Sequence, residues 1–167
     1  MAATYFHVCP IPLEEGSVIC PGNFGRVINQ YRPRDLGTLA SRELSFEIVR
    51  LQHFPARPSR LTSIFLLPTV AHATVYRHQY AFSSLIYEVE PIDEKEVFNG
   101  DMSLITTLFP TEFTPAIPFM MDLARQYWTG LGEIQQTSEL LTEAAVRIVR
   151  RLDIPDLIVG APGATGS

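Results

Sequence analysis

The sequence predicts a single domain of the α+β class, with more short strands than long helices. Segments typical of strands do not alternate with helices in the βαβ rhythm of a parallel sheet, and no internal repeat is visible. The 167 residues are 46% hydrophobic and 19% charged, a balance that allows one normal hydrophobic core. We expect one folded domain over residues 1–159 and a small, Gly-rich, disordered tail over residues 160–167.

The first third of the chain predicts two short strands and a helix. Residues 4–9 are rich in aromatic and β-branched side chains, which favour a strand. Residues 17–20 predict a second strand, ended by a Pro-Gly-Asn turn. Residues 39–54 carry apolar side chains at helical spacing, with Glu43 and Glu47 among them, and predict a helix.

The middle of the chain predicts a strand, a helix and a second strand. Residues 61–67 are an apolar run that breaks at a Pro-Thr corner. Thr69 is suited to cap a helix over residues 70–83, because its hydroxyl can accept a hydrogen bond from an amide of the first turn. Residues 85–90 alternate apolar and polar side chains, as a half-buried strand does.

A hairpin is predicted next, around the dipeptide Asn99-Gly100. Asn-Gly favours the tight turns that join antiparallel strands. Residues 96–98 and 102–108 would then be the two strands that the turn connects.

The last part of the chain predicts one clear helix and one ambiguous segment. Pro115 or Pro118 opens a helix that runs through Trp128, with Gly130 as its C-cap. Residues 138–152 are rich in Leu, Glu, Ala and Arg, which favour a helix by propensity. Their second half alternates like an edge strand, and we interpret the segment as two short strands on grounds given below.

Composition and charge exclude several classes of protein. The net charge is −5 with the basic residues scattered, so a stable complex with nucleic acid is disfavoured. Cys9 and Cys20 give neither a disulfide framework nor a metal-binding spacing. No stretch approaches the roughly 18 apolar residues of a membrane span, and no secretory signal is visible. We therefore expect a soluble cytoplasmic protein, with delivery as an effector left open.

Five residues stand out as candidates for chemistry, although each has an ordinary structural explanation. His7 in a strand, Glu139 in an apolar run and Asp101 after a predicted turn are all common in structural roles. Phe65 and Tyr76 are by default core aromatics. They are eleven residues apart, close to three helical turns, so the two rings could enclose a flat ligand. Common motifs for nucleophiles, phosphate loops or zinc are absent from the sequence.

Taken in order, several segments resemble the ADP-ribosyltransferases. The likeness is greatest to the rifamycin ADP-ribosyltransferases and to a related uncharacterised bacterial family, and it extends to the poly(ADP-ribose) polymerases. The likeness is carried by five segments. They are Tyr-Phe-His-Val (residues 5–8), Gly-Ser-Val-Ile-Cys-Pro-Gly (16–22), Ile-Phe-Leu-Leu-Pro-Thr-Val-Ala-His-Ala (64–73), Ile-Tyr-Glu-Val-Glu-Pro (86–91) and Glu-Ala-Ala-Val-Arg-Ile-Val (143–149). The resemblance implies a split β-sandwich of two small, mostly antiparallel sheets with flanking helices.

The resemblance also implies a site for NAD+ as co-substrate. His7 would hydrogen-bond the nicotinamide ribose, and Val8 would offer its backbone N–H and C=O to the carboxamide. Phe65 and Tyr76 would enclose the nicotinamide ring. Glu139 is similar to the catalytic glutamate at the start of a late strand, which is why we favour strands over a helix at residues 138–152. No metal ion is implied.

The sequence also departs from the family pattern. Phe65 stands where the family has a tyrosine, so stacking is kept and a hydroxyl is lost. The rifamycin enzymes use an aspartate after the Glu-Pro strand, a region where this chain has Asp101. Asp101 and Glu139 therefore compete for the catalytic role, and Glu143 is a third candidate.

The expected activity is cleavage of NAD+ at the nicotinamide–ribose bond and transfer of ADP-ribose to an acceptor. Arg26 and Arg60, each beside a turn, are candidates to bind the pyrophosphate. Two alternatives stay open: an NAD+ glycohydrolase, and an interaction module with this fold that has lost turnover. The sequence does not identify the acceptor, nor whether the biological role is that of a toxin, an effector, a defence protein or a resistance enzyme.

Overall fold

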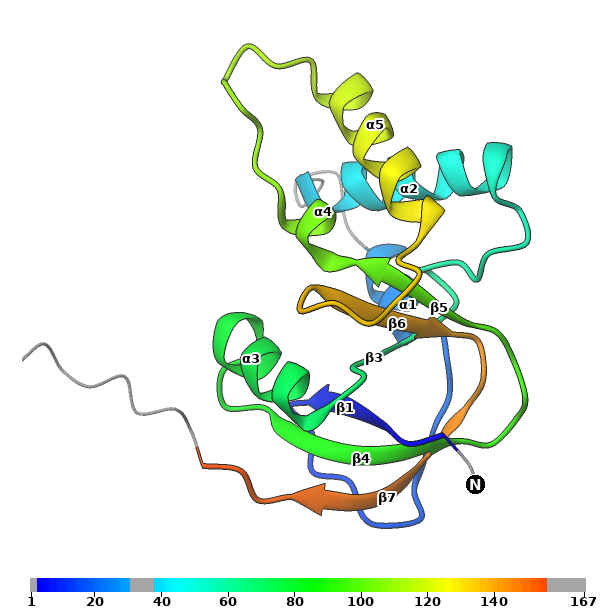
Figure 1. Ribbon diagram of the computed structural model, residues 1–167, viewed down its shortest axis with the longest axis vertical. Coiled ribbons are helices and arrows are strands. Elements are labelled where there is room, and N and C mark those ends of the chain that lie inside the picture. Colours follow the sequence, from blue (N-terminus) through cyan, green and yellow to red (C-terminus); the bar gives the residue numbers. More distant parts are fainter. Residues whose placement is uncertain (1–2, 31–37, 156–167) are drawn as a thin grey trace, which may run out of the picture.

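The computed structural model describes residues 3–30 and 38–155, and the predicted tail over residues 160–167 lies outside these ranges (Figure 1). The described residues form seven strands and five helices. The strands are β1 (Tyr5–Cys9), β2 (Val18–Ile19), β3 (Ile64–Leu66), β4 (Leu85–Pro91), β5 (Val97–Asp101), β6 (Ser138–Thr142) and β7 (Val146–Leu152). The helices are α1 (Asn23–Ile28), α2 (Thr38–His53), α3 (Val70–Tyr80), α4 (Met102–Thr106) and α5 (Ala116–Thr129).

The strands form two sheets, which confirms an α+β protein with two antiparallel sheets and flanking helices. One sheet has the strand order β1-β4-β7-β2 and the other β3-β6-β5. Each strand pairing in the described residues is antiparallel. In Figure 1 the three-stranded sheet lies between the four-stranded sheet and the pair of helices α2 and α5, while α3 lies beside β1 and β4.

The two sheets meet where β1 passes the end of β3. The backbone N–H of Phe6 donates to the carbonyl of Leu67 at 2.9 Å, and the N–H of Leu67 donates back to Phe6 at 2.8 Å. This single bridge uses the edge of β1 that does not face β4. It fixes the position of β1 relative to β3.

The hydrophobic core divides along these layers. An inter-sheet cluster contains the buried side chains Ile64, Leu66, Tyr87, Val89, Leu140, Val146 and Ile148. A helical cluster joins α2 and α5 to the three-stranded sheet through Phe46, Val49, Phe98, Ile105, Leu123, Ala124, Tyr127, Trp128 and Leu141. Leu140 and Leu141 belong to different clusters because successive strand residues point to opposite faces. The central strand β6 is therefore buried on both sides.

Residues 138–152 form the strands β6 and β7, as we predict, although helix propensity favours a helix there. β6 pairs with both β3 and β5, and β7 pairs with both β4 and β2. Pairing on two edges, with burial of β6 on both faces, outweighs a propensity difference of at most about 1 kcal/mol per residue.

The prediction of a hairpin at Asn99-Gly100 is wrong. Both residues lie inside β5, where they pair with Leu140 and Glu139 of β6. The segment predicted as a strand over residues 102–108 instead begins with the short helix α4. Asp101 caps this helix, because its carboxylate accepts a hydrogen bond from the N–H of Ser103 at 2.9 Å. A side-chain cap of this kind favours a helix over continued strand.

Gly100 is required by packing and not by a turn. A Cβ atom at Gly100 would lie 2.6 Å from the ring of Tyr127, so the absence of a side chain lets this ring lie directly on β5. We expect Gly100→Ala to lower the free energy of unfolding by about 1–3 kcal/mol, the usual cost of overpacking a core. Gly132→Ala is the matched control, since nothing lies within 4 Å of its added Cβ. Equal urea midpoints for the two variants would contradict this explanation.

The predicted helix ends are largely confirmed. The hydroxyl of Thr69 accepts from the N–H of His72 at 3.3 Å at the start of α3. Pro115 is the N-cap of α5 and Gly130 is its C-cap. The short helix α1, by contrast, is not predicted, and it packs through Gly25, whose added Cβ would clash with the carbonyl of Leu61.

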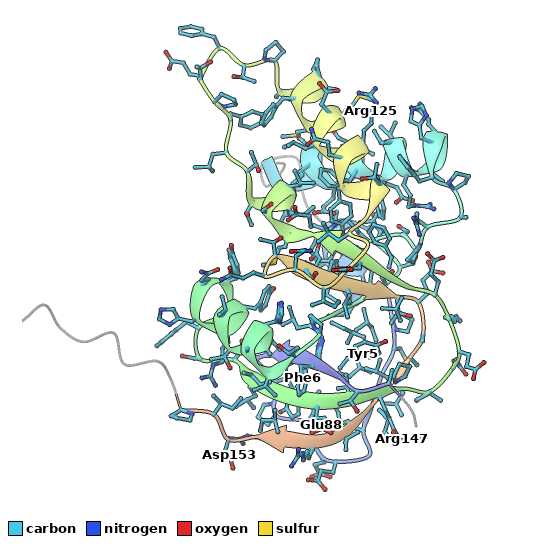
Figure 2. The ribbon with its side chains drawn as sticks, viewed as in Figure 1. Tyr5, Phe6, Glu88, Arg125, Arg147 and Asp153 are labelled. Carbon is cyan, nitrogen blue, oxygen red and sulfur yellow. The ribbon has the colours of Figure 1, made fainter. Side chains whose placement is uncertain are left out.

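Charged side chains cover the four-stranded sheet on the side away from the three-stranded sheet. Arg147 donates to Glu90 at 3.1 Å and Arg150 donates to Glu88 at 2.7 Å, each across the β4–β7 pair. Figure 2 shows Glu88 and Arg147 at this lower side of the molecule. Such exposed pairs contribute little stability, and they mark the solvated face of the sheet.

Candidate functional site

A cavity of about 370 Å³ lies where the two sheets meet, in the size range of small-ligand sites. Strands, helices and loops that are far apart in the sequence all contribute to it. Its lining residues are His7, Val8, Phe24, Arg42, Arg60, Phe65, Leu66, Leu67, Tyr76, Tyr80, Met102, Ile105, Thr106 and Glu139.

Six of the eight residues predicted for the site line this cavity. They come from four secondary-structure elements and one loop: His7 and Val8 from β1, Phe65 from β3, Tyr76 from α3, Glu139 from β6, and Arg60 from the segment before β3. Arg60 and Glu139 are 79 residues apart in the sequence and face the same space.

The remaining two, Arg26 and Asp101, lie elsewhere, as does Glu143, the third candidate for the carboxylate. The exposed Arg26 donates to the side chain of Asn23 and does not line the cavity. Asp101 caps α4, and its carboxylate also accepts from the hydroxyl of Ser103 at 2.6 Å. Glu143 accepts a hydrogen bond from Thr62 outside the cavity. The geometry therefore favours Glu139 over Asp101 and Glu143 as the carboxylate of the site.

His7 has a defined tautomer. Its Nδ1 lies 3.0 Å from the carbonyl oxygen of Phe65, which can only accept, so Nδ1 carries the proton. Burial lowers the pKa of His7 below its ordinary value of 6.5, and the bond to Phe65 offsets this in part. The ring is therefore neutral near pH 7, and its Nε2 can accept a hydrogen bond from a ligand.

This lowered pKa predicts a loss of stability in acid. The unfolded chain binds more protons than the folded protein at pH values between the two pKa values of His7. The contribution of neutral His7 is therefore complete above pH 6.5 and is lost as the pH falls through the folded value. We expect His7→Asn to reduce the difference in unfolding free energy between roughly pH 7.5 and roughly pH 5. Urea denaturation at both pH values measures this, and an unchanged difference would contradict it.

Glu139 is placed by strand geometry. It lies on the face of β6 that points toward α5, two residues before Leu141, which packs in the helical cluster. The hydroxyl of Tyr127 donates to Oε1 of Glu139 at 2.9 Å, and Arg60 donates to the same oxygen. Gly100, opposite Glu139 in the register, leaves the room for Tyr127 to reach it.

Arg60 is buried and ion-paired, and it lines the cavity, so it is not a surface arginine. Its side chain is 5% exposed and contacts Glu43 on one side and Glu139 on the other. Burial lowers the pKa of Arg60, but Glu139, Tyr127 and Glu43 raise it by more, so it stays well above its ordinary value. The guanidinium also lies 4.8 Å from the ring centroid of Phe65.

Aromatic rings form much of the remaining wall. The half-buried Phe65 is met edge-on by Phe24 of α1, with ring centroids 5.1 Å apart. Tyr76 lies 5.5 Å from Tyr80 one turn along α3. Burial raises the pKa of Tyr76, as does the charge of Glu139, so its hydroxyl keeps its proton at neutral pH. The cavity thus offers ring faces, the hydroxyls of Tyr76, Tyr80 and Thr106, and the carboxylate of Glu139.

Sequence reasoning did not assign Phe24, Arg42, Glu43 and Tyr127 to the site. Glu43 gave the only signal, as an acidic residue among the apolar positions of a predicted helix. In the structure Glu43 is 1% exposed and faces inward. Arg42 beside it lines the cavity and donates to the carbonyl of Ile105 at 2.9 Å.

The fold and the cavity define an α+β protein with a buried carboxylate and aromatic rings at the junction of two sheets. The model of a family described as a protein of unknown function, DUF2441, matches residues 23–154, and the chain belongs to this family. The match includes Arg60, Phe65, Tyr76 and Glu139 but begins after β1. No curated protein matches the chain significantly.

Two features are absent from the part of the chain that the structure describes. Within residues 3–30 and 38–155, no three side chains of His, Cys, Asp and Glu come together in a way that could hold a metal ion. None of the helices in these same ranges combines the length and the apolar character needed to cross a membrane.

Proposed function

We propose that the protein is an ADP-ribosyltransferase that binds NAD+ in this cavity and cleaves the bond between nicotinamide and ribose. One observation carries the proposal: His7, Val8, Phe65, Tyr76 and Glu139, which the family resemblance singles out one by one, line a single cavity. The split β-sandwich of the family is likewise proposed, on the basis of two antiparallel sheets joined at β1 and β3.

The edge of β1 supports binding of the nicotinamide carboxamide. The N–H and C=O of Phe6 point away from β4, because both bond to Leu67. Backbone groups two residues apart along a strand point the same way, so those of Val8 face this same edge. The chain turns away at Pro68, so Val8 can offer one donor and one acceptor to an amide.

The side chains fit the ribose next to that amide. Nε2 of the neutral His7 accepts a hydrogen bond from a ribose hydroxyl, and Phe65 and Tyr76 supply ring faces for nicotinamide. Arg60 and Tyr127 both donate to Oε1 of Glu139, which leaves Oε2 for a second ribose hydroxyl. At about 370 Å³ the cavity suits the nicotinamide–ribose end of NAD+.

The reaction needs neither a metal ion nor a covalent nucleophile. The C–N bond to ribose breaks, and nicotinamide leaves as a neutral amide with the electron pair. The acceptor's oxygen or nitrogen bonds to the ribose carbon, and its proton passes to solvent. Glu139 stabilises the positive charge that develops on the ribose, so its effect is strongest in the transition state.

A second candidate is a protein that binds NAD+ without turnover. The observation that favours it is the engagement of Glu139 by both Arg60 and Tyr127, which reduces the negative charge that the carboxylate presents to a ligand. The two candidates differ in a single measurable product, free nicotinamide.

The test is incubation of the purified protein with NAD+, with free nicotinamide measured over time and NAD+ binding measured by calorimetry. We expect release from the wild type and none from His7→Ala. ADP-ribose recovered on an added acceptor identifies a transferase, and free ADP-ribose identifies a glycohydrolase. Binding without release would favour the second candidate, and absence of both would overturn the proposal.

A further inference from the structure

A buried chain of ionic contacts runs from α2 to the cavity. Oε2 of Glu43 accepts a hydrogen bond from Nε of Arg60 at 2.9 Å. Nη1 of Arg60 donates to Glu139 and to the hydroxyl of Tyr127, the latter at 2.8 Å. The side chains of Glu43, Arg60 and Glu139 are 1%, 5% and 8% exposed, so water does not compete for these contacts.

We infer that Glu43 is a positioning residue, which holds the guanidinium of Arg60 in the orientation that fixes Glu139. The inference rests on the proposed function, because it assigns Glu43 a role in the activity of Glu139. Glu43 itself does not line the cavity.

The geometry indicates that Glu43 orients the guanidinium of Arg60 and does not merely attract its charge. Glu43 is bonded at Nε and Glu139 at Nη1, so rotation about the Cδ–Nε bond, which swings the whole guanidinium group, would break both contacts. Glu43 is in turn fixed by Arg42, which donates to its Oε1 from two nitrogens at 3.1 and 2.9 Å. Arg42 reaches Ile105 beside the cavity. The chain therefore begins and ends at the cavity wall.

Stability alone gives a weak reason for this arrangement. Apolar residues in place of a buried ion pair are often equally stable or more stable, because desolvation of charge is costly. α2 is already held by the fully buried Phe46 and Val49. The indole of Trp128 also donates to the carbonyl of Phe46 at 2.8 Å. Two carboxylates on one guanidinium are better explained by the need to place Glu139.

The test is Glu43→Gln, which keeps the size of the side chain and removes its charge. The matched control is Glu47→Gln on the same helix. Glu47 pairs with Arg50 at 2.7 Å and accepts from Ser59 at 2.8 Å, without contact to Arg60 or the cavity. Both variants remove one carboxylate of α2 that is bonded to an arginine.

We expect Glu43→Gln to reduce kcat for nicotinamide release about 10- to 100-fold, as a small misplacement of a reacting group does. The KM for NAD+ should change little, because the aromatic rings and Val8 still bind the ground state. Glu47→Gln should keep the kcat of the wild type. Glu43→Asp, which keeps the charge, should recover part of the loss. Equal kcat values for Glu43→Gln and Glu47→Gln would overturn the inference.

A readout that does not need turnover separates this inference from the proposed function. In the wild type, the Nε–H proton of Arg60, which Glu43 accepts, should exchange slowly with solvent, and in Glu43→Gln it should exchange faster. If the wild type releases no nicotinamide, the proposed function fails, and this measurement still decides the role of Glu43. Exchange of this proton that is as slow in Glu43→Gln as in the wild type would overturn the inference whatever the activity.

Discussion

Glu139→Gln is expected to reduce nicotinamide release by about 10²–10³-fold, the loss typical when a preorganised electrostatic group is removed. Glutamine has nearly the shape of glutamate and can still accept from Tyr127, but it carries no charge to stabilise the developing ribose cation. NAD+ binding should remain close to that of the wild type, because the rings of Phe65 and Tyr76 are unaffected. Release rates and calorimetric affinities, measured on the same preparations, check both parts.

Asp101→Asn is the matched control for this experiment. Asparagine caps helices about as well as aspartate, so α4 should stay intact. Burial raises the pKa of Asp101, but hydrogen bonds from Ser103 and Thr137 together lower it by more, so the pKa stays below its ordinary value and the substitution also removes a charge. Asp101 does not line the cavity, and we expect release near the wild-type rate. Loss of release in Asp101→Asn, with Glu139→Gln still active, would reassign the catalytic carboxylate.

Arg60→Met is expected to have the largest effect on stability, lowering the free energy of unfolding by about 3–5 kcal/mol. The substitution keeps an apolar stem of similar length but leaves Glu43 and Glu139 buried without the cation between them. An uncompensated buried charge costs far more than the lost attraction. Equilibrium denaturation in urea measures the difference.

Two further variants make this result interpretable. Arg57→Met removes an arginine three residues away whose pairing with Glu96 is exposed, and we expect a loss of at most about 1 kcal/mol. The double variant Arg60→Met with Glu139→Gln should recover part of the stability, because one of the two unpaired buried charges is removed. A loss below about 1 kcal/mol for Arg60→Met, or no recovery in the double variant, would show that the buried network is not what holds this region.

Elements with local signals were predicted from the sequence. The aromatic and β-branched run at residues 4–9 forms β1, the hydroxyl of Thr69 caps α3, and Pro115 and Gly130 bound α5. Each of these signals acts within a few residues: it concerns a strand former, a capping oxygen, or a residue that starts or ends a helix. Such preferences act before any tertiary contact forms.

The wrong prediction at Asn99-Gly100 shows that a local sequence preference can be overridden by tertiary packing. Asn-Gly favours a turn in isolation, but Gly100 is there because the ring of Tyr127 packs against it. Residues 138–152 show the same limit, since their helix propensity is overridden by pairing with strands from four other parts of the chain. The strand interpretation there came from the family resemblance and not from the local pattern.

The candidate site, too, was predicted from the sequence only in part. The sequence by itself determined the α+β class, the main capped helices and the order of the motifs that single out His7, Phe65, Tyr76 and Glu139. Only the tertiary structure decided that these residues share one cavity, and that Arg60 is a buried partner of Glu139. Arg60 meets Glu43 across 17 residues and Glu139 across 79, and contacts at such separations depend on how the layers pack.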